Sequence, residues 1–213
     1  MAIPYMMCGM YKEAVSLLRL RMSLQLTMLQ HCASAKDSAE CSRTTYLLSL
    51  CLLKTGNYTE AIQMINNQLK HIPKYTPIGG RFYMLLMKCF LHATNLPKHM
   101  ESAIIAFDAS KAIFTYVLGP NHPIHCLLMT LLGDHYYQMN AINESVLALT
   151  ATAEFCRRTL VDHAHVLTAA CLLKLARCHM KLMQIKNENI DNGMVNADKS
   201  LDYLQEALDT YNR

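Results

Sequence analysis

The chain has 213 residues, of which 52% are hydrophobic and 17% are charged, and its formal net charge is +4. This length and apolar content support one domain with a continuous core, and seven Gly and six Pro are too few for long linkers. Lys and Arg occur singly or as dipeptides, which disfavours a nucleic-acid binder and favours acidic protein partners. No apolar run approaches the roughly 18 residues of a membrane span and no signal peptide is visible, so we expect a cytoplasmic protein.

Residues that favour helix dominate the sequence, and apolar residues recur at helical spacing. In chain order they predict a short helix within 1–8, a helix over about 10–30, and helix hairpins over about 38–72, 79–118, 123–160 and 165–211. The polar stretch 31–42 indicates a loop or a helix extension, and 186–193 indicates a surface loop. The first hairpin lacks most of its first helix, which suggests a fragment, an alternative start or part of a longer array.

A six-residue motif separates the helices within each pair. Its copies are Gly9-Met10-Tyr11-Lys12-Glu13-Ala14, Gly56-Asn57-Tyr58-Thr59-Glu60-Ala61, the weaker segment Asn140–Ser145, and fainter segments ending at Ser102 and Ser200. We expect Gly or Asn to end one helix in a left-handed conformation. The small residue at the end of the motif then lets the second helix approach the first. A second small position lies 12 residues earlier, at Ala2, Ser49 and Gly133.

From Met1 to about Tyr211 the motif resembles that of tetratricopeptide repeats (TPR), although these units are longer than the usual ~34 residues and the consensus Trp is absent. The joint Leu118-Gly119-Pro120-Asn121-His122-Pro123, with a degenerate copy over 160–166, resembles the joint of kinesin-light-chain-type repeats. There Gly ends one helix and Pro lies in the first turn of the next. The resemblance implies an all-α fold: a right-handed α-solenoid of antiparallel hairpins, about four and a half repeats in a single domain, 1–213.

Residues capable of chemistry are few and explained by the repeat. Most of the nine Cys lie in apolar helical runs and predict buried free thiols. His122, His125 and Cys126 are close in sequence and make a zinc site conceivable, but no Cys-x-x-Cys pair occurs. Phosphate-loop and hydrolase motifs are absent. We therefore expect no catalytic residues, no metal and no cofactor, and a protein that is not an enzyme.

The resemblance also implies that the first helix of each hairpin lines a concave, mildly basic groove. Counting from the motif's small residue places on it Arg43, Lys54, Lys88, Asn95, Asp134, Tyr137, Gln138, Lys174, Arg177 and Lys181. Lys and Arg can hold an acidic side chain or a terminal carboxylate, and Asn or Gln can pair with an extended backbone. A solvated helix face would fit these residues equally well.

We therefore expect a non-catalytic scaffold or adaptor that binds a protein or peptide segment, acidic segments included, and neither nucleic acid nor membrane. The alternative is an interaction domain of a larger enzyme, such as a ubiquitin ligase or SET–MYND-type methyltransferase, or a cytoskeletal or ciliary assembly subunit, which leaves cytoskeletal or ciliary association open. Apolar residues around Leu17, Leu18 and Leu20 lack a full partner helix. They predict self-association through the N-terminal end.

Overall fold

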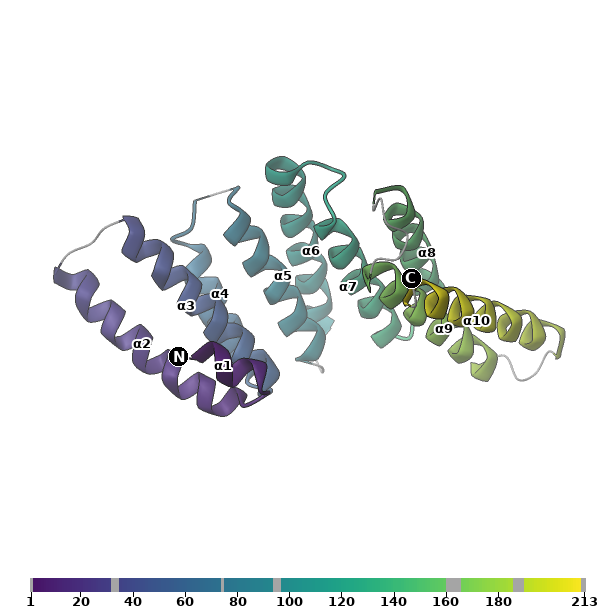
Figure 1. Cartoon of the computed structure of the whole chain (residues 1–213), viewed down its shortest axis with the longest axis horizontal. Helices are drawn as coiled ribbons and strands as arrows, with labels where there is room; N and C mark the ends of the chain where they lie inside the picture. The colour runs from purple at the N-terminus through teal and green to yellow at the C-terminus, as the bar shows by residue number, and fades with distance from the viewer. Residues whose placement is uncertain are drawn as a thin grey trace. The chain divides into compact units, whose positions relative to one another are not determined.

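A computed structural model of the chain describes residues 2–31, 35–73, 75–93, 97–159, 166–185 and 190–211. All regular elements in these ranges are α-helices, and consecutive helices form pairs (Figure 1). The all-α prediction is therefore confirmed. The chain divides into two compact units, Met1–Val117 and Leu118–Arg213. The expectation of a single domain stays a prediction.

The first unit contains one pair with a short first helix and two full pairs. Its helices are α1 (Ala2–Met7), α2 (Tyr11–His31), α3 (Ala35–Lys54), α4 (Tyr58–Leu69), α5 (Pro77–His92) and α6 (Pro97–Leu118). These bounds confirm the predicted hairpins. Since α3 begins at Ala35, the polar stretch 31–42 is largely a helix extension, with residues 32–34 outside the described ranges.

The second unit contains two full pairs, in which α7 (Ile124–Gln138) is followed by α8 (Ile142–Thr159) and α9 (Val166–Ile185) by α10 (Ile190–Tyr211). The predicted loop over 186–193 falls partly outside the described ranges, and α10 already includes residues 190–193. Among the helices of the described chain, none combines the length and the apolar character needed to cross a bilayer.

The recurring motif has the predicted conformation in its three clearest copies. Gly9, Gly56 and Asn140 have φ of 74°, 81° and 62°, in the left-handed region. At Gly56, the amide of the following residue donates to Leu52 O at 2.9 Å and the Gly56 amide donates to Leu53 O at 3.2 Å. The same two bonds recur around Gly9 and Asn140. This Schellman arrangement satisfies carbonyls at the end of the first helix before the second begins.

The small residues of the motif allow close helix approach, as predicted. Ala14, Ala61 and Ser145 are fully buried. The Ser145 hydroxyl donates to Gly133 O on the paired helix at 2.8 Å, which confirms the match between these two positions. In the fainter copy that was predicted to end at Ser102, the small residue lies one position later, because Ala103 is buried whereas Ser102 is only half-buried.

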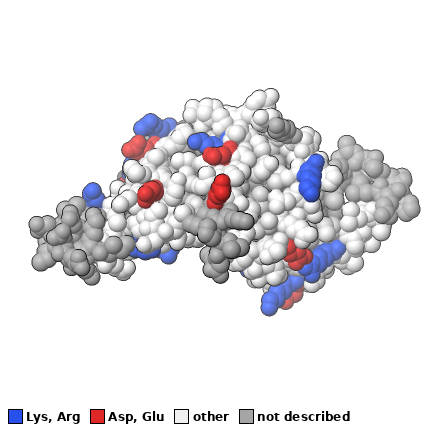
Figure 2. Space-filling view, turned by 180° about the vertical axis from the view of Figure 1, so that it is seen from behind, with Lys and Arg blue, Asp and Glu red and all other residues white. Residues whose placement is uncertain are grey.

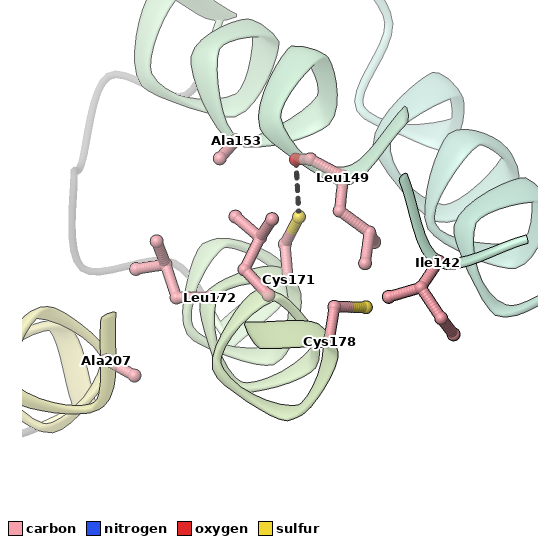
Figure 3. Close-up of a cluster of buried hydrophobic side chains, with 8 residues drawn as sticks. Ile142, Leu149, Ala153, Cys171, Leu172, Cys178 and Ala207 are labelled. Atoms are coloured by element: carbon pink, nitrogen blue, oxygen red, sulfur yellow. Dashed lines mark hydrogen bonds between the residues drawn. The ribbon is translucent and has the colours of Figure 1, made fainter. Parts of the chain in front are cut away.

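The core of the second unit lies between α8 and α9. Leu149 and Ala153 of α8 pack against Cys171 and Leu172 of α9 (Figure 3). The Cys171 thiol donates to Leu149 O at 3.1 Å.

The joint before α7 follows the predicted order of Gly and Pro. Gly119 ends α6 with φ of 85°, and Pro123 is the N-cap of α7. His125 is buried and its Nε2 donates to Gly119 O at 3.0 Å, while the Ile124 amide donates to Nδ1 of His122 at 3.2 Å. Both histidines therefore hold the joint together. The degenerate copy over 160–165 lies outside the described residues.

Candidate binding face

Five polar residues of the second unit meet between its two first helices. Asp134 and Tyr137 are three residues apart on α7, and Lys174, Arg177 and Lys181 share one face of α9 at spacings of three and four residues. Two of their contacts, Asp134 with Lys174 and Tyr137 with Arg177, join residues 40 apart in sequence, which is one repeat. Five of the predicted groove residues therefore lie together: Asp134, Tyr137, Lys174, Arg177 and Lys181.

Tyr137 is the centre of this group, which we call the cation–tyrosine cluster (Asp134, Tyr137, Lys174, Arg177 and Lys181). Arg177 Nε donates to the Tyr137 hydroxyl at 3.2 Å, and its guanidinium carbon lies 4.5 Å from the ring centre. Lys181 Nζ lies 4.6 Å from the same ring centre. The ring quadrupole attracts both cations and holds them at the surface.

The cluster carries excess positive charge. Lys174 forms an ion pair with Asp134, so these two charges largely cancel. Arg177 is exposed and Lys181 half-buried, and neither has a carboxylate within ion-pair distance among the described side chains. A cation–π contact at an exposed site contributes about 0.5–1 kcal/mol and leaves the charge in place. Two cations beside a tyrosine can therefore receive a carboxylate.

The other predicted groove residues lie apart from this cluster. Gln138 is exposed at the end of α7, in the same unit. In the first unit, Arg43 and Lys54 are exposed on one face of α3, and Lys88 is half-buried on α5. Asn95 lies outside the described residues. Alignment of Lys88 with Lys174 along one groove stays a prediction.

Sequence reasoning missed the pairing of Lys174 with Asp134. Both residues were placed on the groove, but Lys174 was expected to hold a ligand. Their separation of 40 residues, which equals that of Tyr137 and Arg177, was a usable signal. Equivalent positions of successive first helices are neighbours in a repeat fold, so opposite charges at this spacing pair with each other.

Four of the buried thiols are poor nucleophiles. Burial raises the pKa of Cys89 and of Cys171 to about 12, and also raises the pKa of Cys51 and Cys178. The thiolate is the reactive form, and it is scarce at neutral pH under these conditions. The prediction of buried free thiols is confirmed for six cysteines, whereas Cys8 is exposed, Cys41 is half-buried and Cys32 lies outside the described residues.

His122, His125 and Cys126 of the joint are the residues that made a zinc site conceivable. Burial lowers the pKa of His135, which favours the neutral imidazole. Within the part of the chain that the structure describes, no group of three or more His, Cys, Asp or Glu side chains lies close enough together to hold a metal ion.

Comparison with solved structures identifies the fold. A Podosopora anserina protein described as a kinesin light chain with nearly identical TPR-like repeats is similar over 100% of this chain and 93% of its own, at 18% identity and a TM-score of 0.70. BtubC (BKLC) from P. vanneervenii is similar over 95% of this chain and 89% of its own, at 12% identity and a TM-score of 0.60. No family model and no curated protein matches the sequence. The chain thus has the fold of kinesin-light-chain-like TPR repeats.

Proposed function

We propose that this TPR-like chain is a non-catalytic protein-interaction scaffold, and that the cation–tyrosine cluster binds an acidic or carboxylate-bearing segment of a partner protein. The cluster carries the proposal, because Arg177 and Lys181 face solvent beside Tyr137 without a described carboxylate. Arg in this setting can bind a carboxylate through two parallel hydrogen bonds. Arg43, Lys54, Lys88, Asn95 and Gln138 would extend the same basic surface if the expected groove is continuous.

A protein partner suits the charge distribution better than nucleic acid does. On the face shown in Figure 2, the described Lys and Arg side chains are few and lie among Asp and Glu rather than in one continuous basic patch. Nucleic-acid binders concentrate their basic residues. We also propose a cytoplasmic location and an association with the cytoskeleton. The second proposal is based on a similar structure that is described as a kinesin light chain.

The proposal is tested with an array of synthetic peptides that are acidic, neutral or basic, each with a free or an amidated C-terminus. We expect acidic peptides to bind the whole chain with an affinity that falls as salt is added. The double variant Arg177→Glu, Lys181→Glu should bind them at least about tenfold more weakly, because it reverses the local field.

A matched control changes the net charge by the same amount elsewhere. Lys12→Glu, Lys70→Glu replaces two exposed cations of the first unit and should retain binding. Helicity should be unchanged in both variants because all four side chains are at least partly exposed. Equal affinity and equal salt dependence for wild type and the Arg177, Lys181 variant would show that the cluster is not the binding surface.

A further inference from the structure

Helix α10 carries a row of exposed leucines. Leu201, Leu204 and Leu208 are 64%, 37% and 54% exposed, and their spacing of three and four residues places them on one face. A different face of α10 is buried through Ser200 and Ala207. Grouped large apolar side chains at a surface mark an interaction site more often than single ones do.

Helix α8 has a row of residues equivalent to the leucine row of α10, and two serines establish the correspondence between the helices. Ser145 of α8 donates to Gly133 O at 2.8 Å, and Ser200 of α10 donates to Ala176 O at 3.3 Å. Each serine therefore bonds to a small residue of its own first helix and occupies the same repeat position. On this register, Leu204 of α10 corresponds to Leu149 of α8.

The equivalent row of α8 is covered by a helix. Leu149 and Ala153, the counterparts of Leu204 and Leu208, are 1% and 2% exposed and pack against Cys171 and Leu172 of α9 (Figure 3). At these repeat positions, a second helix thus packs against the apolar side of another amphipathic helix. In α10 the same positions carry Leu204 and Leu208, and both remain exposed.

The charges beside the leucine row favour a positively charged partner. Asp198, Asp202 and Asp209 are exposed and lie along one flank of the row. No Lys or Arg forms an ion pair with them among the described side chains, and Asp209 accepts only from Gln205, at 2.9 Å. Lys199 lies on the opposite side of the helix.

We propose that the leucine row of α10, with its flanking aspartates, is a docking surface for a basic amphipathic helix of a partner protein. The apolar side of that helix would cover Leu201, Leu204 and Leu208. Its Lys or Arg residues would face the three carboxylates. This surface uses none of the residues of the cation–tyrosine cluster.

The test uses a labelled synthetic peptide that copies Val166–Ile185 of this chain with Cys171→Ala and Cys178→Ala. This segment carries Lys174, Arg177 and Lys181 and no Asp or Glu, and in the chain it packs on the equivalent row of α8. Fluorescence anisotropy with the whole protein should show saturable binding. A peptide with Lys174→Glu, Arg177→Glu and Lys181→Glu should not bind.

Variants of the whole protein locate the site. Leu201→Ser, Leu208→Ser should weaken peptide binding at least about tenfold. The control Leu147→Ser removes another leucine, 72% exposed on α8, and should bind as wild type does. Asp198→Asn, Asp202→Asn should bind several-fold more weakly at low salt, and the difference should vanish at high salt. Arg177→Glu, Lys181→Glu should leave binding unchanged, which separates this proposal from the proposed function.

Three results would overturn the proposal. The first is absence of peptide binding to the wild-type chain. The second is equal binding by wild type and the double leucine variant, since the peptide would then occupy another surface or replace α9. The third is a dimer in sedimentation equilibrium that the double leucine variant abolishes, because the occupant would then be a second copy of the chain.

Discussion

Gly133 lies where the side chain of Leu149 comes against the backbone of α7. A Cβ atom added to Gly133 would lie 2.6 Å from both Cγ and Cδ2 of Leu149. We expect Gly133→Ala to lower the free energy of unfolding by about 1–3 kcal/mol, because the helices must separate or Leu149 must leave its rotamer. Urea denaturation followed by circular dichroism measures the change.

A double variant checks the cause of that loss. Leu149→Ala alone should cost about 2–5 kcal/mol through the cavity that it leaves. If the two side chains compete for the same space, Gly133→Ala, Leu149→Ala should cost clearly less than the sum of the single changes. Additive costs would mean that the added methyl group disturbs something other than Leu149.

Cys89 and Cys171 make stability depend on alkaline pH. Burial raises the pKa of each thiol from 9.0 to about 12. Between these values the unfolded chain loses a proton that the folded chain keeps, so the stabilisation is complete below pH 9 and is lost as pH rises toward 12. The loss should approach about 1.4 kcal/mol per pH unit for each thiol. Denaturation at pH 8 to 11 should give a shallower decline for Cys89→Ala, Cys171→Ala, and equal slopes would contradict this account.

At the scale of single elements, Gly56 and Asn140 occupy equivalent turns with different residues. Both have φ near the left-handed minimum, where a Cβ is costly for most residue types. Gly56→Ala should therefore reduce the free energy of unfolding by about 1–2 kcal/mol. Asn140→Gly is the matched control and should be nearly neutral, because both residues accept this conformation. Thermal unfolding compares the two variants, and a similar loss in both would show that backbone strain is not the cause.

Helix ends were predictable from the sequence because local chemistry determines them. Gly56 and Pro123 act on their own backbone, so their roles follow from residue type alone. The register of the third motif copy was predicted one residue early, at Ser102. That copy begins with Pro97, where the clearer copies have Gly or Asn. The ion pair of Lys174 with Asp134 was missed because it depends on packing between two first helices.

At the scale of the whole molecule, the first helix pair is unequal. α1 has 6 residues and α2 has 21, and Leu20 and Leu24 of α2 are 60% and 58% exposed. We predict self-association through this end and fast amide exchange over residues 1–30, because few apolar contacts hold it. Hydrogen exchange and sedimentation velocity measure both. Leu20→Ser, Leu24→Ser should reduce self-association, whereas slow exchange throughout this segment of a monomer would contradict the prediction.

Contacts between successive repeats join residues that are close in sequence, and this affects how the chain folds during its synthesis. Arg157 and Glu206, on second helices of successive pairs, are 49 residues apart, and the two hydrogen bonds of the cation–tyrosine cluster each span 40 residues. Partners separated by one repeat leave the ribosome within about 2–10 s of each other at a synthesis rate of ~5–20 residues per second. Local contacts also close quickly, since little loop entropy opposes them. Within each unit, a helix pair can therefore pack against its predecessor while later residues are still being translated, so little of that unit's apolar surface waits unpaired during synthesis.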